Sequence, residues 1–368
     1  MTKPAIDLVA GARPNFMKLA PVVRALQSNA RIPFRIIHTG QHYDPAMTDV
    51  FFEELGIPKP HVYLEVGSGS HGAQTARIIE RYESHAMSTK PAATVVFGDV
   101  NSTIACALAA VKLGIAIVHV EAGLRSFDRT MPEEINRLLT DSISELLLVS
   151  EESGITNLRH EGVPDERVRL VGNVMIDTLL MHLPAAREKR AAEKLGLADR
   201  EYGVITLHRP SNVDDPATLS RLVRLFLDLA RDLPLVFAVH PRTIAVAERS
   251  GISDLIAPGQ DRLICLGPQP YLDTISLVSG AAVVLTDSGG LQEETSVLGV
   301  PCLTLRENTE RPITVRLGTS RLVGNASERI AAAFADVLNK AWPPGQAIPL
   351  WDGHSGERVA KELAAWMY

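Results

Sequence analysis

Short apolar runs alternate along the chain with longer segments in which apolar residues recur every three or four positions. Such runs, bounded by turn residues, are typical of buried strands, and the longer spacing is typical of amphipathic helices. Strands that alternate with helices predict parallel sheets. The expected strands are Ile6–Val9, Arg35–His38, Ala93–Phe97, Ile115–Val120, Leu146–Val149, Arg169–Val171, Gly203–Leu207, Leu235–Val239, Arg262–Cys265, Ala282–Leu285 and Cys302–Leu305.

The alternation restarts in the middle of the chain. A charged, alanine-rich segment, Ala185–Arg200, precedes a fresh strand near Gly203, and 368 residues exceed what one core usually covers. We therefore expect an α/β protein with two doubly wound domains, residues 1–172 and 173–350, and a cleft between them. A last helical segment lies within residues 351–368.

Composition narrows the class of protein. The net charge is −6 and the pI is near 6.0, so the chain offers no basic face for nucleic acid. Cys106, Cys265 and Cys302 lie among apolar neighbours without metal-type spacing, which favours buried thiols in a reducing compartment. No signal peptide or membrane span is evident, and we expect a cytoplasmic protein.

The segment HVEAGLRSFDRTMPEEINR carries the densest set of charges. Glu121 directly follows a buried-type strand, where a carboxylate is costly unless it is paired or used. Arg125 follows in the loop, and Glu133 and Glu134 open a helix after a proline. Two acids in a first turn can simply complement the helix dipole, so Glu121 is the stronger candidate.

Two other loops of the first half follow strands. GARPNFMK places Gly11, Arg13 and Lys18 at a helix start. The glycine would let the backbone approach an anionic ligand, and the two cations would attract it. An ordinary turn with solvated charges fits the segment equally well. GDVNST places Asp99 at a strand end, beside the strand that Glu121 follows. An N-cap and a turn aspartate are the plain alternative.

The second half offers a phosphate cradle. TDSGGLQEE leaves Ser288, Gly289 and Gly290 at a helix start, where backbone N–H groups bind phosphate. Glu294 follows in the helix and suits a ribose hydroxyl, although dipole compensation is the simpler explanation.

Arginines and histidines follow other strands of the second half. His208 and Arg209 in TLHRPSNVD, His240, and Arg311 in RENTERP lie at or beyond predicted strand ends, where ligands bind in open sheets. Carboxylates in one half and a phosphate cradle in the other indicate an enzyme that acts on a diphosphate-linked sugar.

GARPNFMKLAP, TGQHYD, GDVNST, HVEAGLRSFD, MPEEINR, TLHRPSNVD, TDSGGLQEE and RENTERP together resemble the non-hydrolysing UDP-N-acetylglucosamine 2-epimerases, in order from Gly11 to about Gly324. The resemblance implies a glycosyltransferase-B fold with two Rossmann-like domains and a C-terminal helix that crosses back to the first. It also implies interconversion of UDP-GlcNAc and UDP-ManNAc without a cofactor, usually by a homodimer.

The resemblance further implies a mechanism and its residues. Anti elimination of UDP gives 2-acetamidoglucal, and UDP is added back after protonation of C2 from the opposite face. The residues that match the family's catalytic positions are Asp99, Glu121, Glu133 and His208. Those that match or suit its nucleotide-sugar contacts are Gly11, Arg13, Lys18, Arg125, Arg209, His240, Ser288, Gly289, Gly290, Glu294 and Arg311.

The sequence departs from the family pattern in places. SFDRTM replaces a longer loop before Glu133, HRPSN stands where many members have HRREN, and SHGA replaces a basic residue before Gln74 that belongs to an allosteric site. Gln41, His42 and Arg209 remain compatible with that site. The alternatives are an epimerase of another UDP sugar, such as a 2,3-diacetamido uronic acid, or, less in keeping with the clustered carboxylates, a glycosyltransferase.

Overall fold

The computed structural model describes residues 4–28, 32–40, 52, 54–257 and 262–368, without the side chain of Arg13. The chain forms two compact units. Unit 1 contains Met1–Thr178 and Pro349–Tyr368, and unit 2 contains Leu179–Ile348. The division falls inside α7 (Val174–Glu188), a few residues beyond the boundary at residue 172 that we expected.

Unit 1 is built on a parallel sheet of seven strands in the order β3-β2-β1-β4-β5-β6-β7. The order reverses between β1 and β4, the position at which doubly wound sheets bind ligands. The strands are β1 (Ile6–Ala10), β2 (Phe34–His38), β3 (Val62–Tyr63), β4 (Ala93–Phe97), β5 (Ala116–Ala122), β6 (Leu146–Val149) and β7 (Val168–Leu170).

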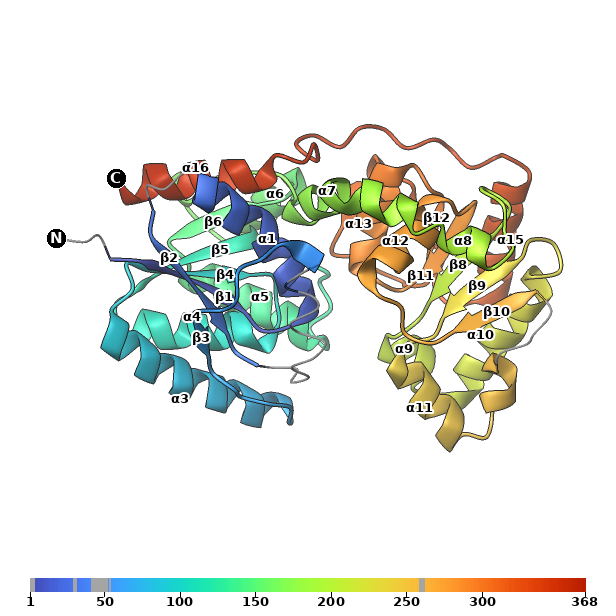
Figure 1. Ribbon diagram of the computed structural model, residues 1–368, viewed down its shortest axis with the longest axis horizontal. Helices are drawn as coiled ribbons and strands as arrows, with labels where there is room; N and C mark the ends of the chain where they lie inside the picture. The colour runs from blue at the N-terminus through green and yellow to red at the C-terminus, as the bar shows by residue number, and fades with distance from the viewer. Residues whose placement is uncertain (1–3, 29–31, 41–51, 53, 258–261) are drawn as a thin grey trace. The chain divides into compact units, whose positions relative to one another are not determined.

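Helices cover both faces of this sheet. α3 (His71–Thr89), α4 (Asn101–Lys112) and α5 (Pro132–Ile143) pack side by side on one face, and α1 (Arg13–Ser28), α6 (Glu152–His160) and α16 (Ser355–Met367) lie on the other (Figure 1). The alanine-rich α4 presents small buried side chains, which lets α3 pack closely against it. The carboxyl end of the sheet thereby receives the helix starts of α1, α4 and α5.

The C-terminal segment belongs to unit 1, and α16 packs along α1 (Figure 1). The indole N–H of Trp351 donates to the Ser150 carbonyl oxygen at 3.1 Å, and the N–H of Gly356 donates to the Asp177 carboxylate at 2.6 Å. A Cβ on Gly356 would lie 2.6 Å from the Pro21 carbonyl oxygen, so only glycine permits this close approach.

Unit 2 has a second parallel sheet, in the order β10-β9-β8-β11-β12-β13. Its strands are β8 (Gly203–Thr206), β9 (Leu235–Ala238), β10 (Leu263–Leu266), β11 (Val283–Thr286), β12 (Cys302–Thr304) and β13 (Ser320–Leu322). Its helices are α8 (Ala191–Lys194), α9 (Pro210–Val213), α10 (Pro216–Leu229), α11 (Pro241–Arg249), α12 (Tyr271–Ser279), α13 (Gly289–Leu298), α14 (Pro312–Arg316) and α15 (Ser327–Leu338). Two Rossmann-like units confirm the predicted fold class.

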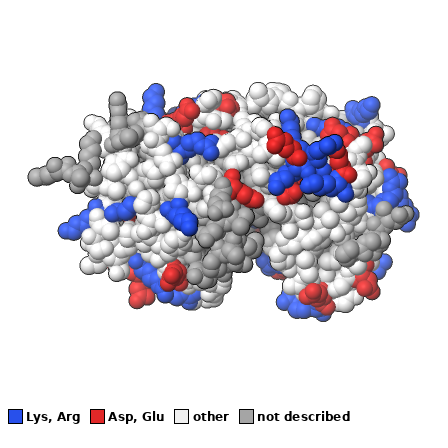
Figure 2. All heavy atoms as spheres, viewed as in Figure 1, with Lys and Arg blue, Asp and Glu red and all other residues white. Residues whose placement is uncertain are grey.

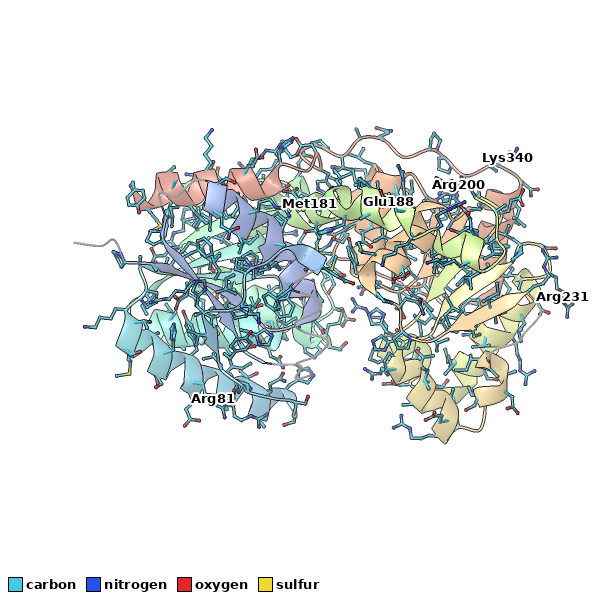
Figure 3. All side chains as sticks on the ribbon, in the orientation of Figure 1. Arg81, Met181, Glu188, Arg200, Arg231 and Lys340 are labelled. Carbon is cyan, nitrogen blue, oxygen red and sulfur yellow. The ribbon has the colours of Figure 1, made fainter. Side chains whose placement is uncertain are left out.

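The surface carries both signs of charge. In Figure 2, blue and red atoms are interspersed, and a mixed cluster covers α8, where Arg190 pairs with Glu193. Basic side chains also brace the scaffold: Arg81, labelled in Figure 3, reaches from α3 to the carbonyl oxygens of Leu64 and Glu65. In the described parts of the chain no helix has the length and apolar character needed to cross a membrane.

Candidate functional site

Glu121 has a backbone conformation that is rare for its residue type. β5 continues through Glu121 to Ala122, beyond the end that we expected, and its pairing with β6 slips between Val120 and Ala122. At this bulge Glu121 has φ = +76°. A non-glycine residue in the left-handed region costs about 1–3 kcal/mol and persists where the surroundings impose it, often at functional sites.

The Glu121 carboxylate is paired with Lys18 from α1, and both residues are buried. The pair packs against Gly98, where an added Cβ would lie 2.6 Å from the Lys18 Nζ atom and 2.9 Å from the Glu121 Oε2 atom. Gly98 itself has φ = +61°. The turn after β4 therefore needs glycine both for its backbone and for the space that the ion pair occupies.

Asp99 follows this glycine and pairs with Arg137 of α5. Arg137 also contacts Glu134 at 3.0 Å, and the Asn136 amide donates to the Asp99 carbonyl oxygen at 2.9 Å. The structure thus brings the Asp99 and Glu121 turns together at the carboxyl end of β4 and β5.

The two glutamates at the start of α5 differ in their surroundings. The Glu134 carboxylate is buried and accepts hydrogen bonds from the N–H groups of Ser126 and Phe127 at 2.9 and 3.0 Å, which fixes the loop before the helix. The Glu133 side chain is half-buried and, among the described residues, forms neither a hydrogen bond nor an ion pair. Glu134 is therefore explained by structure, and Glu133 remains available for chemistry.

Arg125 is held by protein groups. The residue is 3% exposed, and its guanidinium contacts Asp141 at 2.7 Å and Glu161 at 2.6 Å and donates to the Leu124 carbonyl oxygen. We expected Arg125 to bind substrate. The contacts instead anchor α5 and the end of α6 to the loop after β5.

Side chains of the protein itself occupy the space beside the Cα atom of Gly11. A Cβ there would lie 1.9 Å from the Ser102 Oγ atom and 2.5 Å from the Thr39 Oγ1 atom, so packing alone requires glycine. The expectation that Gly11 admits a ligand is thus replaced by a packing role. The Arg13 side chain, Gln41 and His42 lie outside the described part of the chain.

In unit 2, His208 is oriented by a buried carboxylate that the sequence did not single out. The Asp287 carboxylate lies 2.9 Å from the His208 Nδ1 atom and accepts hydrogen bonds from the N–H groups of His208 and Arg209 and from the Asn212 amide at 2.9 to 3.1 Å. Burial raises the pKa of Asp287, but His208 and these donors outweigh it and hold the pKa below its usual value. Asp287 therefore accepts from the Nδ1–H group, and the Nε2 atom of this half-exposed side chain is not bound by the carboxylate.

His240 lies next to His208. The ring centroids are 5.5 Å apart, and the His240 Nδ1 atom accepts a hydrogen bond from the Arg242 N–H at 3.2 Å. Partial burial, and then the neighbouring His208, lower the pKa of His240. Arg209, the residue after His208, contacts Glu310 at 3.7 Å. His240 and Arg209 thus both lie next to His208.

The start of α13 forms an N–H-rich turn, as expected, with one difference. Ser288 is the N-cap residue, and its own N–H donates to the Thr286 hydroxyl at 3.0 Å, so it is not free as we predicted. Gly289 and Gly290 are the first two helical residues, whose N–H groups have no intrahelical partner. A Cβ on Gly289 would lie 2.7 Å from the Glu310 Oε1 atom.

The remaining predicted contacts are buried in unit 2. Glu294, in the second turn of α13, accepts a hydrogen bond from the Tyr271 hydroxyl at 3.0 Å. Arg311 pairs with Glu293. Both side chains are about one-twentieth exposed.

Sequence reasoning missed the residues that hold the others in place, above all Arg137, Asp141 and Asp287. Asp287 in TDSGG could have been noticed as an acid directly after a strand; nothing in the local pattern marks the helix residues Arg137 and Asp141. Among the described residues, no three His, Cys, Asp or Glu side chains gather in a way that could hold a metal ion.

Comparison with known proteins decides the family. The sequence model described as UDP-N-acetylglucosamine 2-epimerase matches residues 24–364. The chain belongs to the UDP-N-acetylglucosamine 2-epimerase family. It is 40% identical over 370 residues to a UDP-N-acetylglucosamine 2-epimerase of Methanocaldococcus jannaschii, covering 99% of this chain and 100% of that protein.

A second relative and a solved structure extend the comparison. A UDP-2,3-diacetamido-2,3-dideoxy-D-glucuronate 2-epimerase of Pseudomonas aeruginosa is 39% identical and covers 97% of this chain and 98% of that protein. A crystal structure of the Methanocaldococcus jannaschii UDP-GlcNAc 2-epimerase in complex with UDP-GlcNAc and UDP superimposes with a TM-score of 0.90 at 40% identity, covering 98% and 99% of the two chains.

Proposed function

We propose that this protein epimerises C2 of UDP-N-acetylglucosamine reversibly, giving UDP-N-acetylmannosamine. The observation that carries the proposal is that the Lys18–Glu121 pair packs against Gly98, directly before Asp99, at the carboxyl end of β4 and β5. Arg137 of α5, the helix whose first turn holds Glu133, pairs with Asp99. The family membership and the relatives that act on UDP-GlcNAc support the choice of substrate.

In the proposed reaction, a carboxylate takes the C2 proton while the C1–O bond breaks and its electron pair leaves with UDP. The C1=C2 bond of 2-acetamidoglucal forms. A second acid then protonates C2 from the opposite face, and the diphosphate oxygen adds back at C1. Such a reaction needs two proton-transfer groups and donors for the leaving diphosphate.

The proposed roles follow the surroundings of each side chain. Asp99, Glu121 and Glu133 supply proton transfer or stabilise positive charge at C1. Lys18 pairs with the Glu121 carboxylate and holds it in place at its strained backbone position.

In unit 2, the N–H groups of Gly289 and Gly290 suit the diphosphate. The Nε2 side of His208, fixed by Asp287, suits an oxygen of the leaving group. We propose the same substrate as the ligand of Ser288, Arg209, His240, Glu294 and Arg311, and of Arg13. Arg125 and Gly11 are assigned to structure.

We further propose a homodimer in the cytoplasm that supplies polysaccharide biosynthesis and needs no cofactor or metal. The exposed Met87 and Leu139 on the α3–α5 face support a second copy as its cover. Three buried free thiols support a reducing compartment.

The competing substrate is a UDP-2,3-diacetamido uronic acid, because a relative at 39% identity is named for it. The test is to measure kcat/KM for both UDP sugars by NMR of the product. A higher value for UDP-GlcNAc supports the proposal; turnover of the uronic acid alone contradicts it.

A further inference from the structure

His119 is a fully buried histidine for which the reaction above has no use. It lies in β5, two residues before Glu121, and is 0% exposed. Its Nε2 atom lies 2.8 Å from the Gly98 carbonyl oxygen, and its Nδ1 atom lies 2.6 Å from the Asp141 Oδ1 atom. Both ring nitrogens therefore have a partner at hydrogen-bond distance.

Both partners are acceptors. A carbonyl oxygen has no proton to give, and an ionised carboxylate accepts only, whereas a neutral imidazole has a single N–H. The other oxygen of Asp141 already accepts from the Gly123 N–H at 3.0 Å and from Arg125. Burial raises the pKa of Asp141, but His119 and Arg125 outweigh burial, and the pKa lies below its usual value. Asp141 is therefore a carboxylate, and His119 can satisfy both acceptors only with two N–H groups.

The carbonyl that His119 holds belongs to the turn at the centre of the site. Gly98 precedes Asp99, and its Cα is covered by the Lys18–Glu121 pair. Asp141 lies on the same helix as Glu134 and Arg137, seven and four residues further on, which places the three on one face of α5. On this face, Glu134 binds the loop before α5, Arg137 binds Asp99, and Asp141 binds His119.

We propose that His119 is a positioning residue, an imidazolium that bridges Asp141 and the Gly98 carbonyl and so fixes the turn that carries Asp99 and supports Glu121. This role rests on the proposed function, since it acts through the two carboxylates assigned to proton transfer. A displacement of about 1 Å at such groups can cost about 100-fold in rate.

Asp141→Asn removes the charges of Asp141 and His119 while keeping their hydrogen-bond geometry. An asparagine oxygen can still accept from Gly123 and Arg125, while its amide can donate to Nδ1 of a neutral His119 that keeps Nε2–H on Gly98. The hydrogen bonds survive and both charges disappear. His119→Asn and His119→Gln instead each keep one of the two donors.

The state of His119 is read by long-range ¹H–¹⁵N correlation spectra of the full-length protein with labelled histidine, assigned with His119→Asn. His38 is an internal neutral reference, because burial lowers its pKa to about 4. Two N–H groups on His119 at neutral pH are expected in the wild type, and one in Asp141→Asn. A neutral His119 in the wild type overturns the proposal, whether or not any variant folds.

Kinetics supply the second readout. We expect kcat of Asp141→Asn to fall about 10- to 100-fold, with KM and UDP affinity within about threefold of wild type. The matched control is His85→Asn. It also removes an imidazole that contacts a carboxylate of unit 1, here Asp7 at 3.0 Å, and it should keep the wild-type kcat. Wild-type kcat in a folded Asp141→Asn protein overturns the positioning role. Failure of the wild type to turn over any UDP sugar refutes the proposed function alone and leaves the spectrum to decide the state of His119.

Discussion

Asp287→Asn is the substitution for which the structure predicts the clearest loss. The carboxylate accepts from two backbone N–H groups, from the Asn212 amide and from the His208 Nδ1–H, and it is 0% exposed. An asparagine has one accepting oxygen, so its NH₂ group must face at least one of these donors. His208 can relieve the conflict only by moving its proton to Nε2, and its ring then loses the carboxylate that fixes it beside the leaving-group oxygen.

The magnitude follows from the hydrogen bonds that asparagine cannot make. Each buried donor without a partner costs about 1–3 kcal/mol, and asparagine leaves at least one, so the unfolding free energy should fall by at least about 1–3 kcal/mol. Loss of one group that stabilises the leaving-group oxygen costs about 10²–10³ in rate. Because the pKa of Asp287 is lowered in the folded protein, its ionised form contributes stability above the unfolded value of about 4 and loses it as the pH falls through the folded value. The stability gap between wild type and variant should therefore narrow in acid.

The assay is turnover of UDP-GlcNAc by product NMR, with urea unfolding at about pH 7 and below pH 4. Asp215→Asn is the matched control, because it removes an exposed carboxylate that caps α10 in the same unit. The control should keep kcat. Full turnover by Asp287→Asn, or a stability gap that widens in acid, would refute the reasoning about the Asp287–His208 pair.

Three further substitutions test other contacts. Gly98→Ala should lower kcat at least about 100-fold, because its Cβ displaces the Lys18–Glu121 pair and its φ is positive, while calorimetric affinity for UDP is retained. Glu133→Gln should lower kcat about 10²–10⁴ without changing the melting temperature, whereas Glu134→Gln should lower the melting temperature because it orphans loop N–H groups; equal effects would remove the distinction. Asp7→Asn should cost about 3–5 kcal/mol in urea unfolding, because a carboxylate paired with Arg35 is removed from the core, and leave kcat unchanged in the folded fraction; an unchanged midpoint would contradict this.

The strand pattern was readable because parallel strands buried on both faces are continuous apolar runs. Ala93–Phe97 and Leu146–Val149 were predicted to the residue. Edge strands carry a weaker signal. Val62–Tyr63 and Ser320–Leu322 are short, incompletely buried strands at the edges of the two sheets, and no apolar run marked them.

The sequence could predict those site residues that follow a strand or open a helix within a single local segment. Asp99, Glu121 and Glu133 follow strands or open a helix, and the sequence shows that directly. The partners could not be read, because Arg137 and Asp141 reach the site through the packing of α5 against the sheet, many residues from Asp99 and His119. For the same reason the sequence could not tell that Arg125 is occupied or that Ser102 fills the space beside Gly11.

The central claim is that carboxylates at the end of β4 and β5 exchange the C2 proton. The direct measurement is C2 deuterium incorporation during incubation of UDP-GlcNAc in D₂O, followed by NMR for the wild type and for Glu121→Gln. We predict deuterium at C2 of both epimers in the wild type and a rate lower by about 10²–10⁴ in the variant, with UDP binding retained. A Glu121→Gln protein that incorporates deuterium at the wild-type rate would contradict the account.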